Sequence, residues 1–205
     1  MSTKKVLTNS QSFDFESLPV PASDANARGR GSEGVTITDV TIPRLEIIQS
    51  LSPQRKKNDP SYINGSEEGL IFNTISHKLY GASVYVIPVF WRKEYVCWRD
   101  RLKGGGFCGA FQSFAEAEDA VASREDAHDI QIRDTAQNFV LVADPDGSTE
   151  EAVISMAKSK MSVSRQWNSL VRMAGGDRFA RVYKLETVIT KGAKGEYFNW
   201  KVTQL

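Results

Sequence analysis

The sequence is poor in the residues that carry most enzyme and metal chemistry. Of its 205 residues only Cys97 and Cys108 are cysteine, and only His77 and His128 are histidine. Two thiols cannot make a disulfide framework, and these four residues lack the spacing of a zinc site. A P-loop, an H-E-x-x-H and a G-x-G-x-x-G opening a helix are also missing. We therefore expect a binding protein with reduced thiols rather than an enzyme, with no catalytic residue, metal or cofactor.

Long hydrophobic runs and a large net charge are missing too. No apolar run approaches about 18 residues, and the first residues have no signal-peptide core, so we expect a soluble protein without a membrane partner. Lys and Arg total 26 against 25 Asp and Glu, and the resulting net charge of +1 excludes a globally basic binder. Recognition of a charged partner must therefore depend on how the charges are distributed.

Residues 1–37 differ from the rest of the chain. They are rich in Ser, Asn, Gly, Pro and charges of both signs, with few spaced apolar groups. Such a segment buries too little apolar surface to offset its ordering entropy, so we expect a flexible arm, followed by one domain over residues 38–205. The arm contains Arg-Gly-Arg-Gly at 28–31, which is more simply a linker than a nucleic-acid contact.

From residue 38 the pattern predicts about seven short strands and two helices. Ser113 and Glu116 make a capping box for a helix over 114–125, and helical spacing continues over 159–174 up to Gly175. The strands are expected at 40–48, 70–75, in a hairpin near 84–101, and at 139–143, 152–156, 179–190 and 197–202. Turns rather than helical crossovers join them, which favours a mainly β fold. We predict a small antiparallel barrel of the oligonucleotide-binding (OB) type with two helices.

Residues 90–107 concentrate aromatic and basic side chains: five aromatic and five basic residues against two acids. Flat rings stack on unpaired bases and cations follow phosphates, so this combination is typical of single-stranded nucleic-acid binding. The stacking residues are predicted to be Trp91, Tyr95, Trp98 and Phe107. The phosphate contacts are predicted to be Arg92, Lys93, Arg99, Arg101 and Lys103. The alternative is that both tryptophans belong to the core.

A second basic region, residues 158–201, has ten Lys or Arg against three acids, whereas residues 114–134 carry a charge of −5. The predicted helix would place Arg165 and Arg172 seven residues apart on one face. Together with Lys158 and Lys160 they complete the predicted nucleic-acid-binding residues. The alternative is an ordinary solvated helix face.

Five segments of the sequence resemble an early-gene protein of tailed bacteriophages and are similar in layout to phage single-stranded DNA-binding proteins with an OB barrel. They are Ile42–Leu45, Leu51–Pro53, Gly69–Asn73, Val86–Phe90 and Gly104–Phe107, and the resemblance spans residues 38–203. It implies non-specific binding of single-stranded DNA in phage replication, recombination or repair, in the host cytoplasm, with phage replication proteins as further partners. The last residues, 199–205, are not acidic, so recruitment through an acidic tail is not implied. A homodimer and a monomer both remain open.

Two other functions compete with DNA binding. The same Trp, Tyr and Arg side chains are typical of protein interface hot spots, which would suit a structural or host-takeover protein of a phage. A nuclease could hold Mg²⁺ with Asp134, Asp144 and Asp146, although Asp144–Gly147 is more simply a hairpin turn.

Overall fold

The computed structural model describes residues 31–145, 147–192 and 195–205, and the chain divides into two units, Met1–Val40 and Thr41–Leu205. In the first unit a 3₁₀ turn, η2 (Ile37–Asp39), is closed by the Asp39 carboxylate, which accepts a hydrogen bond from the Thr36 N–H at 2.8 Å. Residues 1–30 of the expected arm, with Arg28 and Arg30, lie outside the described residues.

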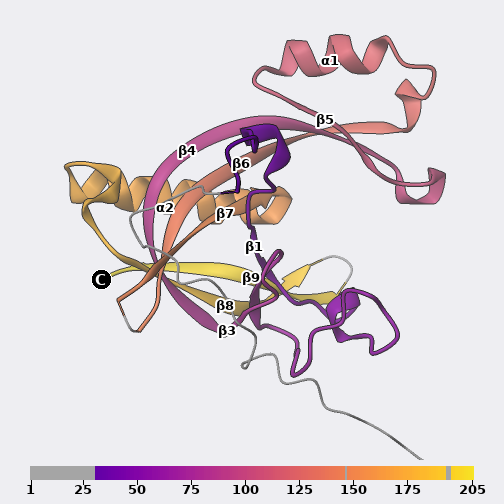
Figure 1. Ribbon diagram of the computed structural model, residues 1–205. Helices are drawn as coiled ribbons and strands as arrows, with labels where there is room; N and C mark the ends of the chain where they lie inside the picture. The colour runs from indigo at the N-terminus through magenta and orange to yellow at the C-terminus, as the bar shows by residue number, and fades with distance from the viewer. Residues whose placement is uncertain (1–30, 146, 193–194) are drawn as a thin grey trace, which may run out of the picture. The chain divides into compact units, whose positions relative to one another are not determined.

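The second unit is mainly β, as the sequence predicts, and its described residues form two α-helices and antiparallel sheets (Figure 1). The strands are β1 (Leu45–Ile47), β2 (Ile71–Asn73), β3 (Leu79–Gly81), β4 (Ser83–Arg99), β5 (Phe107–Phe111), β6 (Ile130–Ala143), β7 (Thr149–Ala157), β8 (Tyr183–Gly192) and β9 (Gly195–Gln204). The helices are α1 (Phe114–Ala122) and α2 (Met161–Ala174). Short 3₁₀ turns occur at η3 (Pro53–Arg55), η4 (Arg101–Lys103), η5 (Ala127–Asp129), η6 (Lys158–Lys160) and η7 (Arg178–Ala180).

β4 organises the larger sheet, whose strand order is β7-β6-β4-β8-β9. One edge of β4 pairs with β6 over nearly its whole length. Its other edge is shared: Ser83–Val86 pair with β8, and Tyr95–Trp98 pair with β5. The smaller sheet has the order β1-β2-β3, and a single parallel bridge between Arg44 and Val153 links it to β7.

The mainly β class is confirmed, but the described strands do not close into the predicted OB barrel. Among the described strands β7 and β9 are the two ends of the larger sheet, and no pairing joins them into a closed barrel. The physical reason is that α2, rather than further rolling of the sheet, covers its apolar face. Trp167 of α2 is fully buried, and its ring lies 5.9 Å from that of Tyr183 in β8.

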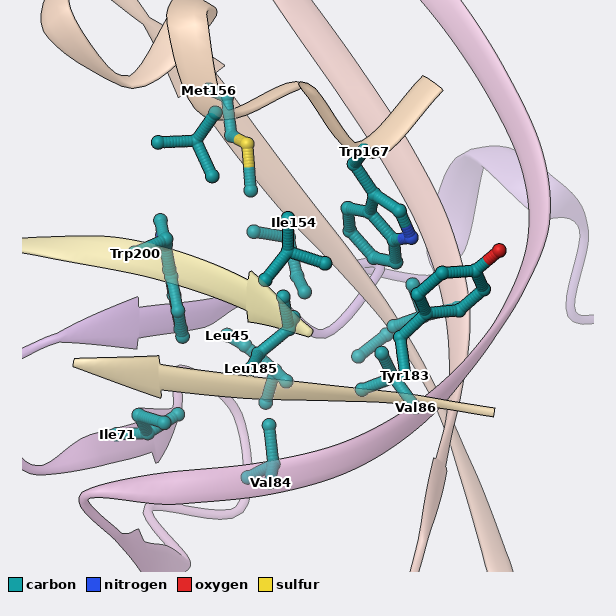
Figure 2. Close-up of a cluster of buried hydrophobic side chains, with 14 of the residues drawn as sticks. Leu45, Ile71, Val84, Val86, Ile154, Met156, Trp167, Tyr183, Leu185 and Trp200 are labelled. Carbon is teal, nitrogen blue, oxygen red and sulfur yellow. The ribbon is translucent and has the colours of Figure 1, made fainter. Parts of the chain in front are cut away.

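The core forms where α2, β1 and β2 meet this face of the larger sheet (Figure 2). Leu45 and Ile71 enter it from the smaller sheet, while Trp200 enters from β9. All three are nearly inaccessible to solvent, and such burial contributes on the order of 25 cal/mol for each Å² of apolar surface. The core therefore packs the first part of β4 and the last part of β6, which we call their inner halves, against α2 and the smaller sheet.

The predicted helices are confirmed, whereas the predicted hairpin near 84–101 is wrong. Ser113 and Glu116 form the predicted capping box of α1, and α2 ends at Gly175, whose φ is +68°. Residues 83–99 form one continuous strand because no turn residue interrupts them, and a register shift between Pro88 and Phe90 accommodates the proline. The sequence reading also missed β3, β5 and the polar first half of β6.

Candidate nucleic-acid interface

The outer halves of β4 and β6 extend past the core and carry β5 and α1 (Figure 1). Side chains alternate between the two faces of this three-stranded region. α1 covers one face, where its Phe114 packs edge-on against Tyr95 at 5.6 Å between ring centroids. The opposite face carries Glu94, Val96 and Trp98, and we call it the open face.

Two adjoining hollows form a groove on the open face, and Trp98 lines both. The outer hollow has a volume of about 720 Å³, and the inner hollow has a volume of about 460 Å³. Basic side chains line the outer hollow, namely Arg99, Arg101, Arg133 and Lys158, against one acid, Asp100. The inner hollow is lined by apolar and hydrogen-bonding groups, among them Glu94, Val96, Phe107, Ala110, Gln137 and Ser155.

Trp98 and Phe107 form an exposed aromatic pair at the groove. They lie opposite each other in β4 and β5, with ring centroids 5.7 Å apart and an interplanar angle of 71°. Trp98 is 40% exposed and Phe107 is 61% exposed. Large rings usually bury more of their surface, so this pair offers ring faces to a ligand.

The cations of the outer hollow come from separate parts of the sequence. Arg101 is exposed in η4, and Arg133 lies in β6, where its Nη2 donates to Gln131 Oε1 at 2.6 Å. Lys158 follows β7 with a φ of +53°, and this left-handed conformation turns the chain from β7 into η6. Sheet pairing therefore gathers positive charge beside Trp98 from three elements.

The structure divides the predicted site residues among several places. Trp91 packs against the core, and its Nε1 donates to Ser164 Oγ at 3.2 Å. Tyr95 and Lys93 lie on the face opposite Trp98, and Lys93 Nζ is 4.8 Å from the Tyr95 ring centroid. Lys103 is exposed in η4. Arg92 lies on the open face, where its Nη2 is 2.5 Å from Glu94 Oε1.

The basic residues around α2 are also separated from the groove. Arg165 and Arg172 are exposed on α2, and neither lines the hollows. Lys160 is half-buried, and desolvation lowers the pKa of its ammonium group while nearby Glu46 opposes the shift. Of the predicted residues, the groove brings together Trp98, Arg99, Arg101, Phe107 and Lys158.

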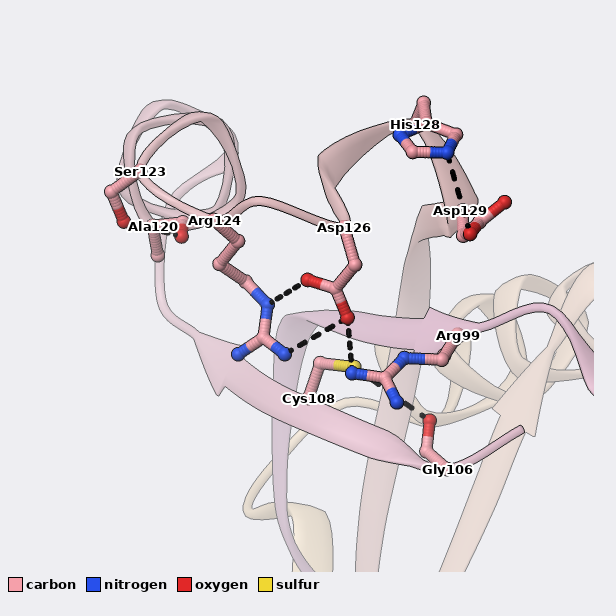
Figure 3. Close-up of polar contacts among 9 residues, drawn as sticks. All are labelled: Arg99, Gly106, Cys108, Ala120, Ser123, Arg124, Asp126, His128 and Asp129. Atoms are coloured by element: carbon pink, nitrogen blue, oxygen red, sulfur yellow. Dashed lines mark hydrogen bonds and ion pairs between the residues drawn. The ribbon is translucent and has the colours of Figure 1, made fainter. Parts of the chain in front are cut away.

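Arg99 is predicted to contact phosphate, yet its guanidinium group is paired with Asp126, which also binds Arg124 (Figure 3). The hydrogen bonds from Arg124, followed by that from Arg99, lower the pKa of the Asp126 carboxyl to about 2. This cluster ties the segment after α1 to the end of β4. The half-buried Arg99 side chain therefore has a structural role, because it holds the segment after α1 against the strand that lines the groove.

Acid should loosen this cluster. A carboxyl whose pKa is lowered on folding stabilises the protein above its unfolded pKa, here near 3.8, and the stabilisation is lost as the pH falls toward about 2. Asp126→Asn should therefore melt at a lower temperature than the wild type near neutral pH, and the difference should vanish in acid. Thermal melts across this range measure it. Glu125→Gln removes the adjacent charge as a control, and an equal effect of both variants would contradict the assignment to the arginine cluster.

Sequence reasoning missed Arg133, Gln131 and Arg44 as groove residues. Arg133 belongs to a segment whose net charge is negative, so the sum of charges gives no sign of a basic site there. Gln131 carries no charge. Only the register of β6, which places Gln131 opposite Trp98 and Arg133 opposite Val96, reveals their place. Arg44 reaches the inner hollow because β1 lies beside β7. An alternation analysis of residues 130–138 could have signalled the strand, but not its partner.

The two carboxylates of the nuclease hypothesis that the structure describes, Asp134 and Asp144, belong to no metal-holding group. Asp144 accepts a hydrogen bond from Lys78 Nζ at 2.8 Å, and Asp146 lies outside the described residues. In the described part of the chain, no group of three or more His, Cys, Asp or Glu side chains is arranged to hold a metal ion. No helix among the described residues has the length and apolar character needed to cross a membrane.

The fold and the groove define a mainly β protein whose sheet presents an aromatic and basic groove. Residues 9–205 match the model of a family described as Pam3 phage gp34-like protein, and the chain belongs to this bacteriophage family. No curated protein and no solved structure matches the chain.

Proposed function

We propose that this phage protein binds single-stranded DNA, without sequence-specific recognition and without chemistry, during replication or recombination in the host cytoplasm. The observation that carries the proposal is the exposed Trp98–Phe107 pair beside the cations of the outer hollow. Every base has a flat face that can stack on such rings, and Arg101, Arg133 and Lys158 supply charge for the phosphates. Binding by stacking and charge is tolerant of sequence.

The groove suits an unpaired strand better than a duplex. In a duplex the base faces are stacked on one another and unavailable to Trp98, so only the phosphates could bind. The adjoining hollows, of about 720 and 460 Å³, provide room on either side of the tryptophan. A single strand could place a phosphate in the outer hollow and a base in the inner hollow.

A protein interface is the second candidate, and one observation favours it. Leu102, next to Arg101 in η4, is 93% exposed, and Phe107 is also largely exposed. Exposed apolar side chains beside arginines are common at protein-binding surfaces. This function predicts that the groove has no affinity for DNA.

The deciding experiment is a salt series of fluorescence titrations with oligo-dT and with duplex DNA. We expect tighter binding of oligo-dT, with log K falling by about 0.7 per neutralised phosphate for each unit of log salt concentration. Arg101→Ala with Arg133→Ala should flatten this slope by about one to two units. Arg165→Ala with Arg172→Ala removes the same charge from α2 and should change the slope little. Equal slopes for the two double variants would place the DNA elsewhere, and no binding at all would favour the protein interface.

A further inference from the structure

Glu94 is the unexpected residue of the groove, because its charged side chain is buried in the wall of the inner hollow. The residue is 6% exposed, although basic and aromatic side chains dominate the surrounding groove. Its Oε1 lies 2.5 Å from Arg92 Nη2, and its Oε2 accepts a hydrogen bond from Gln137 Nε2 at 2.8 Å. These two partners offset the cost of burying the charge and hold the carboxylate in one orientation.

A chain of hydrogen bonds links Glu94 to three other residues that line the groove. Gln137 Oε1 accepts from Ser155 Oγ at 2.6 Å, and Arg44 Nη1 donates to the same hydroxyl. The Glu94 carboxylate can only accept hydrogen bonds, so it requires the NH₂ group of Gln137 on its side, and the amide oxygen then faces Ser155 of β7. Residues from β4, β6 and β7, together with Arg44 just before β1, thus place an acceptor, Glu94, and a donor, Arg44, in the lining of the same hollow.

The lining of the inner hollow suits a nucleic-acid base. Val96 of β4 and Ala110 of β5 pair across the sheet and give the hollow an apolar floor, and Trp98 and Phe107 border the same hollow. Glu94 and Trp98 are four residues apart on the open face, about 13 Å along the strand. A base next to the one stacked on Trp98 would therefore lie over Val96, with its edge toward Glu94.

A carboxylate selects among bases. Each oxygen of Glu94 has one described partner and a further lone pair, so it can accept another N–H. The 4-amino group of cytosine donates such a bond, whereas thymine and uracil present a carbonyl oxygen at that position. A carbonyl facing a carboxylate gains no hydrogen bond and leaves both acceptors unpaired.

We propose that the inner hollow is a base subsite in which Glu94 favours bases with an exocyclic amino group, cytosine over thymine or uracil. This inference rests on the proposed DNA binding and adds a base preference to it. The groove would then combine sequence-tolerant stacking at Trp98 with selection at one neighbouring nucleotide.

The test compares oligo-dC with oligo-dU of equal length on the full chain, because the two bases differ at ring position 4 and the adjoining N3. Wild type should bind oligo-dC about tenfold more tightly, which corresponds to one charge-assisted hydrogen bond. Glu94→Gln should bring the ratio close to one, because an amide can serve either base. Glu118→Gln changes the same charge at an exposed position of α1 that lines neither hollow, so it should leave the ratio at the wild-type value.

The outcomes separate this proposal from the one on which it rests. Equal binding of oligo-dC and oligo-dU by the wild type would overturn the base subsite and leave the DNA groove in place. Absence of binding to either would overturn both. If Glu94→Gln fails to fold, the contact can still be tested on the wild-type protein. The affinity is then measured for an oligonucleotide of 2-pyrimidinone, a base that lacks the 4-substituent. Affinity below that of oligo-dC supports the contact, and affinity equal to it refutes the contact.

Discussion

Replacing Trp98 by alanine is expected to weaken the binding of oligo-dT by about 1–3 kcal/mol, roughly five- to 150-fold in Kd. The ring is 40% exposed at the junction of the two hollows, so its face is available to a base. Its removal takes away the stacking surface and leaves the cations in place. Fluorescence anisotropy of a labelled oligonucleotide, with thermal melts of each variant, measures both consequences.

An exposed phenylalanine outside the groove provides the control for the second ring. Phe107 and Phe179 are 61% and 59% exposed, respectively, but Phe179 lies in η7 and lines neither hollow. Phe107→Ala should weaken binding, and Phe179→Ala should not. Unchanged affinity of the Trp98 variant together with a lower melting temperature would show that the ring is structural, and the groove would lose its main support.

Trp167→Ala is expected to destabilise the fold by about 3–5 kcal/mol, the usual range for deleting a buried tryptophan. The side chain is fully buried between α2 and the larger sheet, next to Tyr183, so its loss leaves a cavity where helix and sheet meet. Urea unfolding monitored by circular dichroism measures the change. Met173→Ala, on the same helix at an 82% exposed position, should change stability by no more than about 0.5 kcal/mol.

A smaller substitution separates the volume of Trp167 from its polar group. Its Nε1 is buried without a hydrogen-bond partner among the described residues. Trp167→Phe removes this unpaired N–H while keeping an aromatic ring, so it should cost much less than alanine. Equal losses for phenylalanine and alanine would show that α2 depends on the full indole.

The sequence predicts local structure best where the signal lies within one element. Ser113 and Glu116 predict the start of α1 because a capping box needs only neighbouring backbone groups. The apolar spacing of α2 likewise predicts its buried face, including Met161 and Trp167. The single strand β4 was harder to predict, because pattern alone cannot separate one long strand from a hairpin without a clear turn signal.

The candidate site was likewise predictable only where its signal lies within one segment of the sequence. Trp98 and Arg101 could be selected from the sequence because aromatic and basic residues gather in one segment. Strand alternation already places Tyr95 and Trp98 on opposite faces, because three positions separate them. Only the tertiary structure shows that α1 covers the face of Tyr95 and leaves the face of Trp98 open. It also shows that Arg133 is a groove residue. In the sequence Arg133 belongs to a segment of net negative charge, and only the register of β6 places it opposite Val96.

The sequence by itself determined the mainly β class, both helices and the concentration of rings and cations around β4. Composition and short-range periodicity carry this information, because they act through neighbouring residues. The tertiary structure alone decided that the sheet stays open under α2, that Arg99 pairs with Asp126, and that Glu94 faces the inner hollow. These outcomes depend on strand register and on which face a helix covers, and both are set by contacts between residues far apart in the chain.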